Sequence, residues 1–100
     1  MLGNRSWSAW IREYSAGHQN PVNQACHMVG IPMIAIAVLL IPFALWRPVA
    51  WMVVAGLFAM GWIFQFVGHA IEQKPPEFFK DWRFLLVGVR WWLARVAGKA

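Results

Sequence analysis

Three histidines, one carboxylic acid and two amides stand out in a chain that is otherwise largely apolar. They fall in two short segments, residues 18–27 and 65–72. The residues are His18, Asn23, His27, Gln65, His69 and Glu72. Neutral imidazoles and a carboxylate suit divalent first-row metals, and the amides Asn23 and Gln65 could fix ligand orientation through hydrogen bonds. If the fold brings the two segments together, these side chains can form a metal site.

The same side chains could instead form a polar network that holds two helices together. In lipid, such a hydrogen bond contributes only ~0.6 kcal/mol on average. Composition and spacing leave both interpretations open. Cys26 faces away from His27 on a helix, so we expect it to be a small packing residue and not a ligand.

The bulk composition is that of a small membrane protein. The chain has 100 residues, of which 60% are hydrophobic and 13% are charged, and this is too apolar for an ordinary soluble domain. Residues 28–46 and 49–71 contain no Asp, Glu, Lys or Arg, and each segment matches the ~20 residues that cross a bilayer. The basic residues are scattered, which favours membrane lipid as a partner and argues against nucleic acid.

The predicted fold is all-α, a hairpin of two transmembrane helices flanked by an N-terminal and a C-terminal amphipathic helix. We expect one membrane domain over residues 1–100, with helices at 4–17, 20–46, 49–73 and 77–97. Asn20 and Pro21 form a helix-start signal, and Pro32 and Pro42 predict kinks. For the last helix, a half-embedded position is preferred over a tilted third span.

The distribution of Lys and Arg predicts the orientation. Arg47 lies alone at the turn of the hairpin. The other basic residues lie toward the opposite end: Arg5, Arg12, Lys74, Lys80, Arg83, Arg90, Arg95 and Lys99. Because Lys and Arg are enriched on the cytoplasmic side, both termini and the metal site are expected there, at the inner membrane if the protein is bacterial.

The hairpin also predicts that the two polar segments meet. His27 and His69 each lie twenty-one residues from Pro48 at the turn, so straight helices place both about 31 Å from it, at ~1.5 Å per residue. Gly61 and Gly68 share the polar face of the second helix and allow close approach of the first. We therefore expect the imidazoles to meet near the inner membrane boundary, with His18 folding over them from the preceding turn.

These residues resemble a known family. The pattern comprises Tyr14, His18, Asn20, Pro21, Asn23, His27, Gly30 and Pro32, followed by Gln65, Gly68, His69, Glu72 and a Lys-Pro-Pro segment. It is similar to the small membrane proteins catalogued as domain of unknown function 962, over nearly the whole chain. Eukaryotic members are Fe(II)-dependent 2-hydroxy fatty acid dioxygenases of the endoplasmic reticulum, which remove one carbon in α-oxidation.

The resemblance implies roles for individual residues. His18, His27 and His69 correspond to metal-binding positions, and Glu72 corresponds to an acidic position whose role is open. The chain departs from its relatives in being short and in having Glu77 after Pro76, where a small residue is more common.

We therefore expect an oxidoreductase that uses Fe(II) and O₂ to shorten 2-hydroxy fatty acids by one carbon at the membrane interface. A cationic side chain would attract the substrate carboxylate, and the candidates are Lys74, Lys80 and Arg83. The alternatives are a haem-binding electron carrier with His27 and His69 as axial ligands, and a non-enzymatic membrane subunit. Whether the protein is a homo-oligomer is left open.

Overall fold

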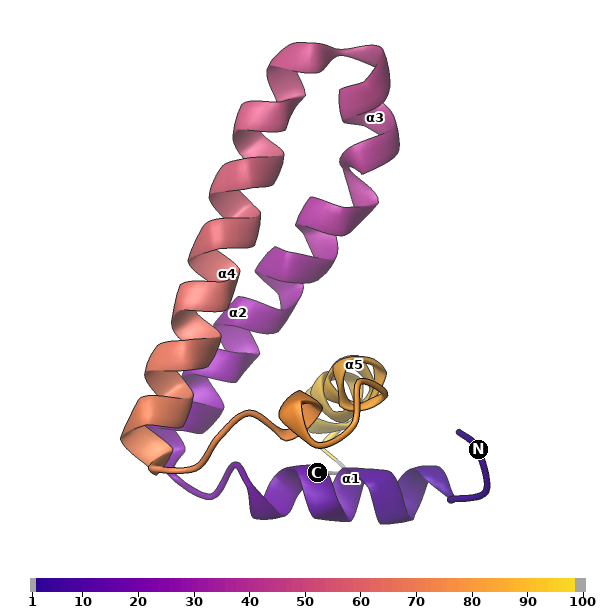
Figure 1. Ribbon diagram of the computed structural model, residues 1–100, viewed down its shortest axis with the longest axis vertical. Helices are drawn as coiled ribbons and strands as arrows, with labels where there is room; N and C mark the ends of the chain where they lie inside the picture. Colours follow the sequence, from indigo (N-terminus) through magenta and orange to yellow (C-terminus); the bar gives the residue numbers. More distant parts are fainter. Residues whose placement is uncertain (1, 99–100) are drawn as a thin grey trace.

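The computed structural model describes residues 2–98, and within that range it contains helices and no strand (Figure 1). The elements are α1 (Trp7–Ala16), α2 (Pro21–Leu39), α3 (Ile41–Trp46), the short 3₁₀ helix η1 (Pro48–Ala50), α4 (Trp51–Glu72), the short 3₁₀ helix η2 (Glu77–Phe79) and α5 (Phe84–Val96). The predicted all-α class is confirmed. Lys99 lies outside the described residues.

A long antiparallel hairpin forms the main body, with α2 and α3 as one arm and α4 as the other (Figure 1). By length and composition the two arms can cross a membrane, since Pro21–Trp46 has 26 residues and Pro48–Glu72 has 25. Helix α2 continues through Pro32, whereas the arm is interrupted at Leu40, just before Pro42. Pro42 explains the interruption, because a proline has no N–H to donate to the carbonyl oxygen four residues earlier.

Glycines set the closest contact between the arms. A Cβ atom on Gly61 would lie 2.9 Å from the carbonyl oxygen of Gly30 and 2.6 Å from Cγ1 of Ile34. A Cβ atom on Gly68 would collide with Oδ1 of Asn23. The predicted small-residue face of α4 therefore lies against α2, and it brings the polar side chains of the two arms within reach of one another.

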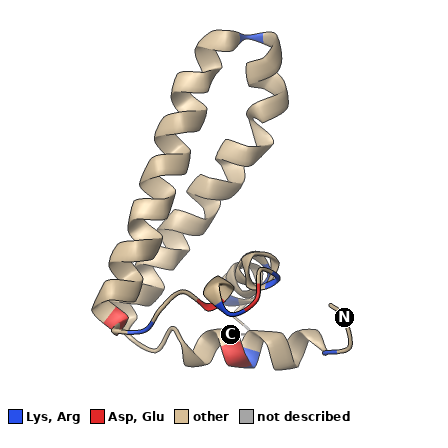
Figure 2. Ribbon diagram, in the orientation of Figure 1, with Lys and Arg blue, Asp and Glu red and all other residues tan. Residues whose placement is uncertain are grey.

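Helices α1 and α5 pack together at the open end of the hairpin, where α5 is seen almost end-on (Figure 1). Their shared core contains Trp10, Tyr14, Phe84, Val87 and Trp91 together with Ile31 of α2. The charged positions gather at this end, apart from Arg47 at the turn (Figure 2).

The C-terminal helix begins at Phe84, seven residues later than expected. Pro75 and Pro76 break the helix, and the chain then passes through η2 and a turn in which Asp81 accepts a hydrogen bond from the backbone of Arg83 at 3.0 Å. The 13 residues of α5 extend only ~20 Å, less than the ~30 Å hydrocarbon core, so α5 is too short for a third span.

Candidate metal centre

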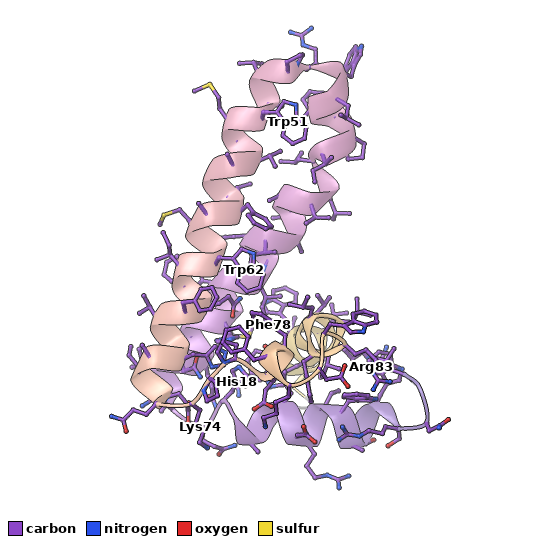
Figure 3. All side chains as sticks on the ribbon, in the orientation of Figure 1. His18, Trp51, Trp62, Lys74, Phe78 and Arg83 are labelled. Carbon is purple, nitrogen blue, oxygen red and sulfur yellow. The ribbon has the colours of Figure 1, made fainter. Side chains whose placement is uncertain are left out.

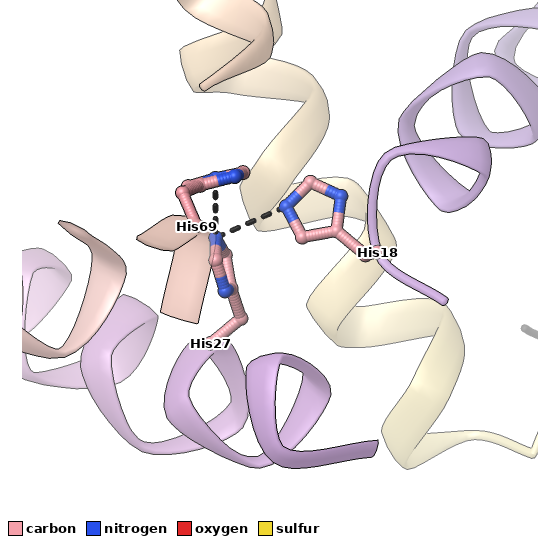
Figure 4. A group of neighbouring side chains, drawn as sticks. All are labelled: His18, His27 and His69. Carbon is pink, nitrogen blue, oxygen red and sulfur yellow. Dashed lines mark hydrogen bonds between the residues drawn. The ribbon is translucent and has the colours of Figure 1, made fainter. Parts of the chain in front are cut away.

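Three histidines from separate parts of the chain converge at the open end of the hairpin (Figure 4). His18 lies between α1 and α2, His27 lies on α2 and His69 lies on α4. Nε2 of His27 is 3.0 Å from Nε2 of His18 and 3.1 Å from Nε2 of His69. One ligand atom from each ring lies within 4.8 Å of the other two, and the side chains are only 1%, 2% and 6% exposed.

Backbone carbonyls fix the protonation of two of these rings. Nδ1 of His18 is 2.6 Å from the carbonyl oxygen of Tyr14, and Nδ1 of His27 is 3.0 Å from that of Asn23. A carbonyl oxygen can only accept, so each Nδ1 carries the hydrogen and each Nε2 of a neutral ring presents a lone pair. Burial lowers the pKa of His18 to about 4, so this ring is neutral at pH 7.

The lone pairs of His18 and His27 thus face each other at 3.0 Å, an arrangement that is favourable only with a cation between them. Imidazole nitrogens bind metals at about 2.0–2.1 Å, so two nitrogens at right angles on one ion lie roughly 2.8–3.0 Å apart. Nε2 of His69 lies 3.1 Å from Nε2 of His27, and its Nδ1 is buried with no hydrogen-bond partner within residues 2–98, so no partner of Nδ1 prevents Nε2 from acting as a third ligand. The three imidazoles could therefore hold one divalent metal ion.

Aromatic rings shield the cluster from water on the side of α1 and α5. The ring of Tyr14 stacks on that of His18 with centroids 4.1 Å apart. The ring centroid of Trp91 lies 5.8 Å from that of His18 and 6.3 Å from that of His27. Burial also raises the pKa of Tyr14, so its phenol keeps its proton.

Glu72, the candidate fourth ligand whose role the sequence left open, does not join the histidine cluster. Its Oε1 accepts hydrogen bonds from the backbone N–H of Asn20 at 2.7 Å and from Nδ2 of Asn23 at 3.1 Å. These bonds tie the end of α4 to the start of α2. The reason is local, since the carboxylate lies at the first turn of α2, where backbone N–H groups lack helical partners.

The two predicted orienting amides also differ from expectation. Asn23 orients the ring of His27 through its backbone carbonyl, while its side-chain amide is directed to Glu72. Gln65 is buried and lines a cavity beside the histidines, but within residues 2–98 no hydrogen bond joins it to an imidazole.

An elongated cavity of about 650 Å³ leads from the histidines along the hairpin. His27, His69, Tyr14, Gln65 and Glu77 supply its polar end. The remainder is apolar, with walls from α2, α4 and α5 that include Ile34, Val38, Phe58, Trp62 and Leu86. Figure 3 shows Trp62 and Phe78, both cavity-lining residues, between the hairpin and α5.

Glu77 is the site residue that sequence reasoning missed. It is only 6% exposed, its Oε1 lies beside Gly17, and its Oε2 is 2.9 Å from Nζ of Lys80. Its one sequence signal is an acidic residue directly after the Pro75-Pro76 break, where the chain turns back between two apolar segments.

The three candidate cations for a substrate carboxylate have different partners. Lys74 donates to the carbonyl of Ala16 at 3.0 Å, and Arg83 forms an ion pair with Asp81 at 2.7 Å. Within residues 2–98, Lys80 is the one of these three whose side chain forms an ion pair with a residue of the cavity wall, namely Glu77. The hydrogen bond from Lys80 to Glu77 also raises the pKa of the lysine, which stays charged at pH 7.

The fold and the site together define a helical protein with two arms that could cross a membrane and a buried three-histidine cluster that could hold a metal ion. Residues 4–100 match the family model described as 2-hydroxy-palmitic acid dioxygenase Mpo1-like, and the chain belongs to this Mpo1-like family. This is the family that the residue pattern indicated. The chain matches no curated protein and no solved structure.

Proposed function

We propose that this protein is an Fe(II)-dependent dioxygenase that shortens 2-hydroxy fatty acids by one carbon at the membrane interface. One observation carries the proposal: imidazole nitrogens converge at the polar end of a cavity whose remaining walls are apolar. A 2-hydroxy fatty acid has the same division, with a polar end of hydroxyl and carboxylate and a long apolar tail. The family description names a dioxygenase of this substrate class.

The residues that would hold the iron are His18, His27 and His69, each through Nε2. Bound Fe(II) would supply the one-electron chemistry that allows O₂ to react with a closed-shell substrate. The chain itself holds the rings in place through the carbonyls of Tyr14 and Asn23. The rings of Tyr14 and Trp91 keep bulk water away from the cluster.

The proposed reaction balances without a further reductant. A 2-hydroxy acid and O₂ give the acid that is one carbon shorter, CO₂ and water. The C1–C2 bond breaks, C1 leaves as CO₂, and C2 is oxidised from an alcohol carbon to a carboxyl carbon. Those two carbons supply all four electrons that reduce O₂.

The lining of the cavity supports one orientation of the substrate. From His27 to Val38 the wall follows eleven residues of α2, about 16 Å at ~1.5 Å per residue. The tail would extend along this wall toward the turn of the hairpin, and the carboxylate would stay near Glu77 and Lys80 at the level of the headgroups. By the bias in basic residues, we place this end and both termini on the cytoplasmic side.

The test is turnover by protein purified without oxygen and loaded with Fe(II). With 2-hydroxypalmitic acid and O₂, we expect the fifteen-carbon acid and CO₂, with one O₂ consumed per acid formed. Palmitic acid, which lacks the 2-hydroxyl, is the matched control and should not react. Iron-loaded protein that consumes no O₂ with any 2-hydroxy acid would refute the proposal and favour a non-enzymatic membrane subunit.

A haem-binding electron carrier is disfavoured by the geometry. The Nε2 atoms of His27 and His69 are 3.1 Å apart, which leaves no space for a macrocycle between them, and His18 approaches the same nitrogen of His27. The absorbance spectrum gives a direct check, because a bound haem has an intense Soret band.

Replacing Lys80 with glutamine should weaken substrate binding. We expect KM for 2-hydroxypalmitic acid to rise about tenfold with kcat changed less than about twofold, since a charged hydrogen bond to the carboxylate is lost in the ground state and the transition state alike. Lys74→Gln is the matched control, because Lys74 contacts a backbone carbonyl of α1. Equal KM values for the two variants would show that Lys80 does not bind the carboxylate.

A further inference from the structure

A second concave surface lies between α1 and α5, and among residues 2–98 it shares no lining residue with the histidine cavity. This groove has a volume of about 610 Å³. Its cationic groups are Arg12 of α1 and Arg90 of α5. Ser8 and Ser15 add hydroxyl groups, and Trp7 and Ile11 provide apolar surface.

Within residues 2–98, no carboxylate neutralises the charge of these two arginines. Glu13 follows Arg12 in sequence, but it forms its ion pair with Arg5 at 3.1 Å. Asp81 and Glu77 are likewise paired, with Arg83 and Lys80. Within residues 2–98 no carboxylate forms an ion pair with Arg12 or Arg90, and both side chains are exposed.

Trp7 helps to form the groove from two helices. The guanidinium of Arg90 on α5 lies 5.0 Å from the centre of the Trp7 ring on α1. This cation–π contact links the two helices that form the groove. Arginine donors and serine hydroxyls suit phosphate oxygens, and guanidinium groups bind phosphate in a bidentate manner. The adjacent apolar surface suits the glycerol and first methylene groups of a lipid.

We propose that this groove binds the phosphate headgroup of an anionic phospholipid. The position of the groove supports a lipid as the occupant, because α1 and α5 lie at the open end of the hairpin, where most basic residues gather (Figure 2). Tyr14, whose carbonyl holds His18, lies on α1 next to Ser15. A lipid that bridges α1 and α5 would therefore stabilise the helix that positions one of the three imidazoles. The proposal does not depend on the reaction catalysed.

The experiment is lipid binding by the full-length protein in detergent micelles, measured by native mass spectrometry with phosphatidylglycerol or phosphatidylcholine. We expect the parent protein to retain phosphatidylglycerol preferentially. A variant with both Arg12→Gln and Arg90→Gln should bind it at least about tenfold more weakly, since each cation at a lipid surface contributes to the attraction.

Arg95→Gln is the matched control, because Arg95 also lies on α5 and within residues 2–98 forms no ion pair, but is outside the groove. It should change binding less than about twofold. Circular dichroism of both variants should show parent helix content, since Arg12 and Arg90 are exposed and Arg95 is partly exposed. Undiminished phosphatidylglycerol binding by the double variant, or equal binding of phosphatidylcholine by the parent, would overturn the proposal. So would displacement of the lipid by inorganic phosphate, which would identify a site for the free anion.

Discussion

Replacing His27 with alanine is expected to reduce metal affinity by more than about 100-fold and to abolish turnover. His27 is central to the cluster, since its Nε2 lies 3.0 Å from that of His18 and 3.1 Å from that of His69. Substitution of groups that merely orient a ligand already costs about 10–100-fold in metal affinity, and loss of the ligand itself should cost more. Metal content after anaerobic purification, together with product formation, measures the effect.

Cys26→Ala is the control for this experiment. Cys26 precedes His27 on the same helix, and its Cβ atom faces Gly68, so alanine preserves the contact between the arms and removes only the thiol. This variant should keep parent iron content and activity. If His27→Ala retained as much iron as Cys26→Ala, the three-histidine site would be ruled out.

The second large effect is expected from Gly61→Ala. The new Cβ atom would meet the carbonyl oxygen of Gly30 at 2.9 Å and Cγ1 of Ile34 at 2.6 Å, so the arms must separate. Overpacking of this kind typically lowers the free energy of unfolding by about 1–3 kcal/mol. Because His27 and His69 lie on opposite arms, we also expect weaker metal binding. Thermal unfolding in detergent and metal content measure the two effects.

Gly56→Ala in the same helix separates packing from helix propensity. Apart from its chain neighbours and the nearby backbone of its own helix, no atom of residues 2–98 lies within 4 Å of a Cβ atom at Gly56. Alanine there should therefore leave metal binding unchanged and stabilise the helix by about 0.5–1 kcal/mol through propensity alone. Destabilisation of the same size in both variants would mean that the Gly61 contact does not set the spacing of the arms.

The sequence alone was sufficient to predict the hairpin and the meeting of His27 with His69. Helical rise is nearly constant, so the equal separation of both residues from Pro48 converts directly into equal depth. The polar faces that carry His27 and His69 also follow from the sequence, because positions four residues apart lie on the same side of a helix. The glycine contacts between the arms and the 3.1 Å distance between the Nε2 atoms of His27 and His69 agree with this predicted equal depth.

Only the tertiary structure decided which acidic residue lines the cavity and how α5 completes it. Gln73 ends α4 with a left-handed conformation, φ 62°, and the segment that follows has no periodicity from which its path could be inferred. That path brings Glu77 to the cavity and Trp91 against His18, whereas Glu72 remains at the start of α2. These contacts depend on how α5 and the segment before it pack against the other helices. Helical periodicity records which face is apolar, but not which partner that face meets.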